Sequence, residues 1–370
     1  MKKRKNFIIA IIFIPIVVTI LFNISRGKTT PQYISGKNII IENKRSKETI
    51  DVEKFIPYVL MAQMDESSPK ELLKAQATVV RTYIYQKMGN SNSIGAVELG
   101  LPFCTKNQLK ERWFEKYRLK EAGTAKGVFY NLTGIGSESV YENQMSRLWD
   151  IVSKTRGKVL KYKGKIVLPL FHQTSNGNTR GGNKNWGEDY SYLKSVKCES
   201  DISESGYLGI KYFSINEFLK KLEKYGIIVY ENKKEKFNEK EQFNKKQQSN
   251  EKEQFNKKQQ SNEKEQFNEK EQDIDQLLNI MDTTNKDKMG YLITIKIGDT
   301  KISGDMFRKA LDLNSLCIDI DKYEKGLRIT TKGQGHGFGM SLSYAKKMAE
   351  NGKDWHEILK TFYECSIVDY

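Results

Sequence analysis

Residues 68–87 read SPKELLKAQATVVRTYIYQK, and this stretch sets the predicted fold. Ser68 and Glu71 have the spacing of a capping box, with Pro69 at the first helical position, so a helix is expected to begin here. Leucine, valine and isoleucine side chains then recur at a period near 3.6 residues. The pattern predicts an amphipathic helix that runs through Lys87 and buries one face.

Gln76 falls inside the apolar stripe of this helix. A buried amide that finds no hydrogen-bond partner costs stability. Gln76 is therefore expected either to tie the fold together or to face a polar cleft.

Helical and strand patterns are mixed over residues 50–370. Beyond residue 290 they predict strands and helices at 291–297, 304–313, 327–331, 341–351 and 355–362. Because these elements lack the rhythm of βαβ units, the predicted fold class is α+β, as a mixed helix and strand ectodomain.

A low-complexity tract interrupts this ectodomain at residues 234–272. Its unit is twelve residues, NEKEQFNKKQQS, and begins at Asn238, Asn250 and Asn262. One phenylalanine per unit cannot build a core, and a solenoid repeat needs a larger and more apolar unit. The tract is predicted to be an expanded surface insertion, either disordered or transiently helical, which a fold tolerates because loop-closure entropy grows slowly with length.

The N-terminus has the pattern of a membrane anchor. Residues 1–6 carry four lysines and arginines, and residues 7–24 are almost unbroken in apolar side chains. About 18 apolar residues cross a bilayer core, and flanking basic residues stay in the cytoplasm. We expect a basic cytoplasmic tail at 1–6, a single transmembrane helix at 7–24, a polar stalk at 25–49 and an extracytoplasmic domain at 50–370. The alternative is a cleaved signal peptide, but no small-x-small cleavage site follows the apolar run.

The net charge of the chain limits the kinds of molecule that it is expected to bind. The chain has 62 Lys+Arg and 46 Asp+Glu, so its formal net charge is 62 − 46 = +16. A basic domain outside the membrane is expected to meet anionic wall polymers or lipid head groups. Nucleic acid is the other partner typical of such charge, and the predicted topology argues against it.

The four cysteines are too few for a disulfide scaffold and show no Cys-x-x-Cys spacing, so neither a metal nor a cofactor is predicted.

Three segments far apart in the chain carry the chemistry. The first is AQMDESSPKELLKAQA at 62–77, followed by Arg-Thr-Tyr at 81–83. The second is FHQTSNGNT at 171–179, and the third is GQGHGFGMS at 333–341. Together, in this order behind a predicted anchor, they resemble the stage II sporulation protein D family of membrane-anchored peptidoglycan lytic transglycosylases.

The resemblance implies a specific reaction. Members of this family act while endospore-forming bacteria engulf the forespore, together with an amidase and a membrane scaffold protein. They cut glycan strands that have lost their stem peptides. The 6-hydroxyl of muramic acid attacks its own anomeric carbon, which leaves a 1,6-anhydro end.

One carboxylate can serve this reaction, because the nucleophile is intramolecular and a single Glu can give and then take the proton. Gln63 stands at the position of the family's catalytic Glu. An amide can neither give up nor take up a proton as an acid or base at neutral pH, and losing general acid–base catalysis costs roughly 10²–10⁴-fold in rate. Three explanations stay open: Asp65 or Glu66 substitutes for the missing acid, the protein binds glycan without cutting it, or the chain is a sequence variant.

The resemblance also implies a set of glycan-binding residues. They are Gln76, Arg81, Tyr83, His172, Thr174, Ser175, His336, Gly337, Met340 and Ser341. For the two histidines the alternative is a purely structural role. Some relatives bind zinc through a local His/Cys cluster, but no histidine lies near Cys104, so no zinc site is expected.

Overall fold

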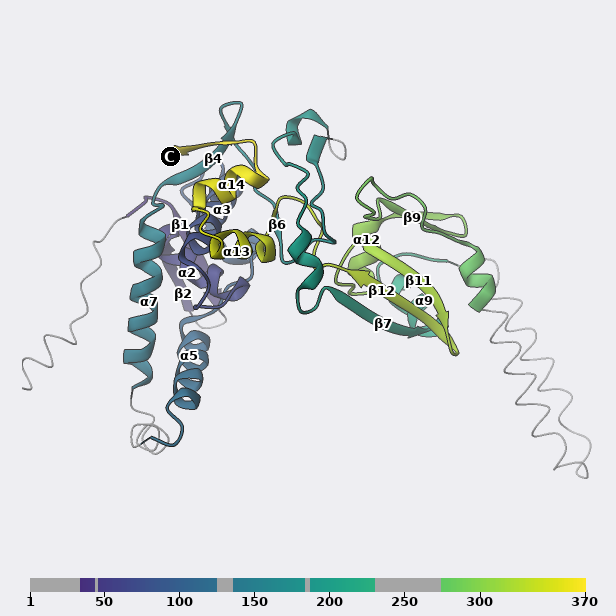
Figure 1. Cartoon of the computed structure of the whole chain (residues 1–370), viewed down its shortest axis with the longest axis horizontal. Helices are drawn as coiled ribbons and strands as arrows, with labels where there is room; N and C mark the ends of the chain where they lie inside the picture. The colour runs from purple at the N-terminus through teal and green to yellow at the C-terminus, as the bar shows by residue number, and fades with distance from the viewer. Residues whose placement is uncertain (1–33, 44–45, 125–135, 184–186, 230–273) are drawn as a thin grey trace, which may run out of the picture. The chain divides into compact units, whose positions relative to one another are not determined.

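The computed structural model describes residues 34–43, 46–124, 136–183, 187–229 and 274–370 (Figure 1). These residues form two compact units. The first holds the described residues up to 169 together with 349–358 and 365–370, and the second holds 170–348 and 359–364. Both combine helices and strands, so the predicted α+β class is confirmed.

The first unit begins with a small sheet. Strand β1 (Asn38–Asn43) pairs antiparallel with β2 (Ser46–Asp51) and parallel with β3 (Ser93–Gly95). Strand β1 and the first residues of β2 lie within 25–49, which the sequence predicted as stalk. The polar composition of 25–49 concealed the strand, because the alternation of Ile39 and Ile41 is short and only Ile39 is fully buried.

Helices pack beside this sheet to form the core of the first unit. They are α2 (Val52–Gln63), α3 (Lys70–Met88), α4 (Ala96–Leu99), α5 (Lys106–Lys120) and α7 (Ser137–Ser153). Asp51 caps α2 by accepting a hydrogen bond from the Glu53 N–H at 2.9 Å. Helix α2 contacts both α3 and α7, and Figure 1 shows α5 beside α7. The buried side chains between them are aliphatic and aromatic.

The predicted helix at 68–87 is confirmed as α3, but its predicted cap is wrong. Pro69 is the N-cap and supplies no side-chain hydrogen bond. Glu71 accepts a hydrogen bond from Lys74 at 2.6 Å and another from the Trp355 N–H at 3.1 Å. Its carboxylate therefore serves the first turn of a different helix, α14 (Trp355–Phe362).

The C-terminus completes a second sheet in the first unit. Strand β14 (Ser366–Asp369) pairs antiparallel with β4 (Lys158–Tyr162), and β4 pairs with β5 (Lys165–Ile166). The boundary between the units falls inside α13 (Leu342–Glu350) and inside α14. Both helices match their predicted positions.

The second unit contains three small sheets. Strands β7 (Leu208–Ser214), β12 (Gly326–Lys332) and β11 (Cys317–Tyr323) form an antiparallel sheet that is plain in Figure 1. Strands β8 (Met281–Asp282), β9 (Thr294–Ile297) and β10 (Thr300–Ser303) form another. Strand β6 (Phe171–His172) pairs parallel with β13 (Met340–Ser341).

Short helices cover these sheets. They are α9 (Ile215–Glu223), α12 (Gly304–Ala310) and the 3-10 turns η1 (Glu188–Tyr190) and η2 (Glu199–Ser203). Phe218 and Phe307 are fully buried in an apolar core shared by α9, α12 and the strands. The predicted strand at 327–331 is confirmed, whereas the one at 291–297 begins only at Thr294.

Several sequence predictions lie outside the described residues. These are the tail at 1–6, the anchor at 7–24, the first part of the stalk and the insertion at 234–272. Within the described ranges, no helix has both the length and the apolar character needed to cross a membrane.

Candidate functional site

Gln63 is the last residue of α2, and its amide is paired with another amide. The Gln63 Oε1 accepts a hydrogen bond from the Nε2 of Gln76 at 2.7 Å. Gln76 lies on α3 and is fully buried, so it ties the two helices together. The Gln63 Nε2 and the Gln76 Oε1 are both buried, and neither has a hydrogen-bond partner among the residues that the structure describes. Position 63 therefore presents an amide that can orient a group but cannot move a proton.

Asp65 lies in the loop between α2 and α3 and is held as an anion. Its Oδ1 accepts hydrogen bonds from the Ser67 N–H at 2.8 Å and the Ser67 hydroxyl at 2.6 Å. The Lys116 Nζ lies 3.1 Å from Oδ2. Partial burial raises the pKa of Asp65, but these hydrogen bonds and the Lys116 charge outweigh it and lower the pKa to about 2. At neutral pH Asp65 has no proton to donate.

Glu66 follows in the same loop and is nearly buried, with 8% of its surface exposed. Its carboxylate forms an ion pair with Lys116 at 2.7 Å, and its backbone carbonyl accepts a hydrogen bond from Arg147 at 2.9 Å. Hydrogen bonds to Glu66 and Asp65 raise the pKa of Lys116, so the shared partner stays charged. Both candidate substitute acids thus share one cation from α5.

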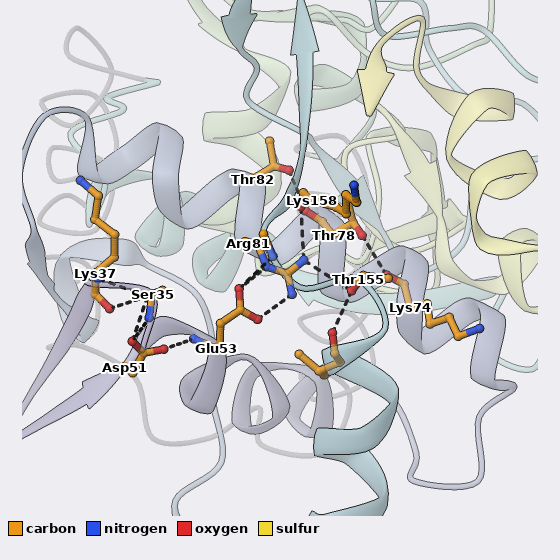
Figure 2. A network of polar contacts seen from close by, with 12 residues as sticks. Ser35, Lys37, Asp51, Glu53, Lys74, Thr78, Arg81, Thr82, Thr155 and Lys158 are labelled. Carbon is orange, nitrogen blue, oxygen red and sulfur yellow. Dashed lines mark hydrogen bonds and ion pairs between the residues drawn. The ribbon is translucent and has the colours of Figure 1, made fainter. Parts of the chain in front are cut away.

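Arg81 was expected to face bound glycan, but its side chain lies inside the first unit. The side chain is fully buried, and its Nε and Nη2 donate to the two carboxylate oxygens of Glu53 at 2.6 and 2.8 Å (Figure 2). Its Nη1 donates to the Lys158 carbonyl at 3.2 Å. Arg81 therefore joins α2, α3 and β4 inside the core, because a guanidinium can satisfy several acceptors at once.

Neighbouring polar residues continue this internal network. Figure 2 shows Thr82, whose Oγ1 donates to the Thr78 carbonyl at 2.6 Å. The same oxygen accepts the Leu160 N–H at 3.0 Å. Tyr83, also expected to bind glycan, is half-buried and donates its hydroxyl to the Leu99 carbonyl at 3.1 Å.

The second and third motifs come together within the second unit. Strands β6 and β13 pair them in parallel, with Phe171 opposite Met340 and His172 opposite Ser341. A further bridge joins Thr174 to Gln334. The family resemblance predicted that these two motifs belong to one site, and this backbone pairing is what brings them side by side.

Asp201, which the sequence did not single out, links these motifs. Its Oδ2 accepts hydrogen bonds from the Ser175 N–H, the Ser175 hydroxyl and the Ser341 hydroxyl at 2.8, 2.7 and 2.7 Å. All three residues are fully buried. Burial raises the pKa of Asp201, and the hydrogen bonds from Ser175 and Ser341 partly offset the rise. Nothing in the local sequence of η2 marks this residue, since its partners are 26 and 140 positions away.

The hydroxyls of Ser175 and Ser341 therefore both donate to Asp201. Thr174 is buried as well, with its hydroxyl 2.9 Å from that of Ser343. Met340 is fully buried, and its N–H donates to the Leu170 carbonyl at 3.1 Å. Gly337 has a φ of +79°, and a Cβ there would lie 2.5 Å from the Tyr291 ring. These residues make contacts inside the second unit, and their predicted role in binding glycan stays a prediction.

The two histidines lie close together in the second unit. The ring centroids of His172 and His336 are 5.8 Å apart. His172 is 4% exposed, and its Nδ1 lies 3.0 Å from the Phe338 carbonyl. Burial, with the neighbouring His336 as a second cause, lowers the pKa of His172 to about 3. Burial and then the nearby Arg308 lower the pKa of His336 to about 4, so both rings are neutral at physiological pH.

Two groups of predicted site residues are therefore real clusters. Gln63, Asp65, Glu66 and Gln76 gather at the α2–α3 connection of the first unit, and His172 gathers with His336 in the second. In the part of the chain that the structure describes, no three His, Cys, Asp or Glu side chains are placed to hold a metal ion.

Comparison with known proteins gives a consistent set of relatives. A family model described as "Stage II sporulation protein" matches residues 42–162, which include Gln63. The stage II sporulation protein D of Bacillus amyloliquefaciens is 26% identical over 330 residues, or 87% of this chain and 75% of the relative. That of Bacillus subtilis is 25% identical over 86% of this chain and 75% of its own length. An uncharacterized protein of Brachyspira hyodysenteriae is 26% identical over 87% of this chain and 67% of its own length.

Proposed function

This chain belongs to the stage II sporulation protein D family, and from that premise we propose that it binds peptidoglycan glycan strands without cutting them. It is a sporulation-related protein. The ligand proposed is the strand left after stem peptides are removed, which the family resemblance implies. The net charge of +16 supports this choice, because each exposed lactyl carboxylate of such a strand carries a negative charge.

The amide at position 63 is the observation on which the proposal rests. Cleavage by intramolecular attack needs a proton for the leaving oxygen and a base for the 6-hydroxyl. Gln63 supplies neither, and its Oε1 is already bound by Gln76. Asp65, with a pKa of about 2, is ionised and cannot act as the acid.

Glycan cleavage with a relocated acid is the second candidate function. Glu66 favours it, because this carboxylate is nearly buried in the loop that directly follows position 63. In that case Glu66 would take over the proton transfer that the family resemblance assigns to position 63.

Digestion of stripped glycan strands distinguishes these functions. The native protein and three variants, Gln63→Glu, Glu66→Gln and Asp65→Asn, are incubated with the strands, and anhydro ends are measured by mass spectrometry. We expect binding without product from the native protein and new product from Gln63→Glu. Gln63→Leu is the matched control, since it removes the amide without adding an acid. Product from the native protein that disappears in Glu66→Gln would overturn the proposal in favour of the second candidate.

We further propose that residues 7–24 hold the protein in the cell membrane, with residues 50–370 on the extracytoplasmic side. The basic residues before the apolar run support this orientation. In that location its partners would be an amidase that strips the strands and a membrane scaffold protein, during engulfment of the forespore. Protease treatment of intact protoplasts should digest the C-terminal domain. Affinity for DNA that falls steeply with salt, without glycan preference, would instead indicate a nucleic-acid-binding protein.

A further inference from the structure

The antiparallel sheet of the second unit has two edges of opposite character. Within the described residues, β12 lies between β7 and β11, so each of these two strands pairs on one side only (Figure 1). On the solvent-facing side of the sheet, β11 exposes Asp319 and Asp321, which form ion pairs with Lys332 and Arg328 of β12. Charged side chains on an edge strand hinder the addition of a further strand. The edge at β11 is therefore protected against pairing with another chain.

Strand β7 has no such protection. Leu208, Ile210 and Tyr212 form a row on the solvent-facing side, and their exposed fractions are 59%, 52% and 55%. The one charged residue of the strand, Lys211, points to the other side and pairs with Asp312 at 2.7 Å. Native proteins seldom leave an apolar edge strand uncovered, because it is a template for pairing with another chain. The row on β7 therefore indicates a surface that another strand covers.

The backbone groups of this row point away from the sheet. The Gly333 N–H donates to the Tyr207 carbonyl at 2.7 Å, one step beyond the last facing pair of β7 and β12. Hydrogen-bonded and non-hydrogen-bonded pairs alternate along an antiparallel ladder. The odd-numbered residues of 209–213 therefore bond to β12, and the even-numbered residues of 208–212 direct their N–H and C=O groups outward. The exposed apolar side chains and the outward backbone groups thus belong to the same residues.

We propose that β7 pairs antiparallel with β7 of a second copy of this chain, with Ile210 opposite Ile210 of that copy. The two three-stranded sheets then form one continuous sheet across a two-fold axis. Strand addition of this kind draws its affinity from main-chain hydrogen bonds and its specificity from alternate side chains. Strand β7 contains no predicted glycan-binding residue, so this pairing does not depend on the proposed function.

Charge and side-chain pattern favour this register over its neighbours. With Ile210 on the two-fold axis, Leu208 lies opposite Tyr212 of the second copy, and the two apolar rows meet on one face. On the other face Lys211 lies opposite Gly209 of the second copy, so no like charges meet. A pairing centred on Lys211 would place two lysines directly opposite each other, which destabilises a sheet.

The second copy is the partner because it supplies the matching edge. A strand that covers this row needs apolar side chains on the residues whose backbone groups face outward, and β7 itself has that pattern. The ring of Tyr212 already rests on Tyr323, with ring centroids 4.9 Å apart, so pairing costs it little freedom. The contact is one short strand long, so we expect a weak and reversible dimer.

Disulfide cross-linking of the full chain in detergent tests the register. In the proposed pairing the Cα atoms of facing hydrogen-bonded residues lie about 5.5 Å apart, within the roughly 4.4–6.8 Å that a disulfide spans. Ile210→Cys should therefore cross-link to itself. Leu208→Cys and Tyr212→Cys should cross-link when the two variants are mixed. Neither should do so alone, because the two equal positions are then about 13 Å apart along the strand.

A thiol at the other edge of the sheet is the matched control. Asp321→Cys exposes it on the same face but on β11, so it should give no more cross-linked dimer than the native protein. The native chain has four free cysteines of its own. Mass spectrometry of the linked peptides separates their cross-links from those of β7.

Sedimentation velocity of the full chain in detergent gives a second readout. Ile210→Lys removes the central apolar pair and places two like charges opposite each other, so the dissociation constant of the dimer should rise at least about tenfold. Met306→Lys, at a position of α12 that is 44% exposed, changes charge and apolar surface in the same way away from β7. It should associate like the native protein. Both substituted side chains are exposed, so both variants should melt like the native protein.

The outcomes separate this pairing from other kinds of association and from the proposed function. A dimer that forms without the Ile210→Cys cross-link, or a mixture of Leu208→Cys and Tyr212→Cys that links no more than either alone, would overturn the inference. A monomeric chain whose β7 amides gain exchange protection only when a different protein is added would assign the edge to that protein and contradict the second copy. Absence of glycan binding would overturn the proposed function and leave the β7 pairing intact.

Discussion

Arg81 is held by four hydrogen bonds inside the first unit, two of them to Glu53. Replacing Arg81 with Ala leaves the nearly buried Glu53 carboxylate without its partner, so we expect the free energy of unfolding to fall by about 3–5 kcal/mol. Urea unfolding followed by circular dichroism measures the change. Gln86→Ala, at an exposed position of the same helix, should change stability by less than about 0.5 kcal/mol.

A second arginine variant tests whether the charge pair itself is needed. The double replacement Glu53→Leu with Arg81→Met removes both charges and keeps apolar volume. The double variant should recover most of the lost free energy of unfolding. A buried ion pair rarely contributes more to stability than well-packed apolar side chains of similar volume. If Arg81→Ala instead left stability intact and abolished glycan binding, Arg81 would be a ligand-binding residue after all.

His172 and His336 make stability depend on pH. Their pKa values in the folded protein are about 3 and about 4, below the ordinary 6.5. Below pH 6.5 the unfolded chain takes up protons that the folded protein refuses, so stability falls as the pH is lowered from 6.5 toward 4. Each histidine contributes a slope of up to about 1.4 kcal/mol per pH unit.

Urea midpoints between about pH 7 and pH 4.5 measure this slope. His172→Gln should make it shallower, and His356→Gln should leave it unchanged. Asp201 acts in the opposite direction, because its raised pKa favours protonation of the folded state and adds stability as the pH falls. Asp65, with its pKa lowered to about 2, loses its contribution only below about pH 4, outside this window. An unchanged slope in His172→Gln would contradict the neutral buried state of that ring.

Among the elements, the loop at 333–341 needs glycine at position 337 both for its positive φ and for lack of space. Gly352, at the end of α13, has a positive φ but no such lack of space, so the two positions can be compared. At Gly337 a Cβ would meet the Tyr291 ring at 2.5 Å, and φ is +79°. At Gly352 φ is +85°, but no heavy atom of the described residues beyond its chain neighbours lies within 4 Å of an added Cβ. Gly352→Ala should therefore cost only the left-handed backbone strain of about 1–2 kcal/mol. Gly337→Ala should cost about 1–3 kcal/mol more, because it also overpacks the core.

Thermal unfolding of the two glycine variants distinguishes strain from collision. The Tyr291 hydroxyl accepts the Asn176 N–H at 2.9 Å and donates to the Asn178 carbonyl at 3.2 Å. Displacing its ring should therefore disturb the second motif as well as the third. Equal melting temperatures for Gly337→Ala and Gly352→Ala would show that the Tyr291 contact yields without cost.

Helices α3, α12, α13 and α14 were predicted from the sequence, whereas α5, α7, α9 and the long-range partners of the predicted helices were not. Helices α3, α13 and α14 follow from periodicity, which is a local property. Glu71 has the spacing of a local cap, yet it binds the N–H of Trp355, 284 positions away. Local spacing cannot show whether the Glu71 carboxylate accepts from a nearby N–H or from one far along the chain. The helix was therefore predicted correctly and its cap was not.

The same limit applies to the candidate site. Gln63 and Gln76 could be singled out, because one held the family position of a catalytic Glu and the other broke an apolar stripe. That they bind each other follows only from the packing of α2 on α3. Arg81 and Ser175 look like ligand-binding residues in a motif, and their burial is decided by Glu53 and Asp201, which lie outside the motifs.

At the scale of the whole molecule, the first unit combines residues from the first half of the described chain with its last residues. Strand β14 lies at the C-terminus and pairs with β4, with Ser366 opposite Lys161 and Asp369 opposite Lys158. The path between them passes through the second unit, so the first unit closes only when the last residues are in place. Its stability is therefore expected to depend on residues 365–370, which no local motif describes.

Removing residues 365–370 tests this dependence on the C-terminus. The truncation deletes β14 and the contact of Tyr370 with the Tyr85 ring, whose centroids are 4.4 Å apart. We expect faster hydrogen exchange in β4 and α3, because β4 loses one of its two partner strands. Exchange in β12, which pairs on both sides within the second unit, should stay as slow as in the full chain. Tyr370→Ala is the matched control and should loosen α3 less than the truncation does. Equal loss of protection in β4 and β12 would mean that the two units unfold as one, contrary to this assignment.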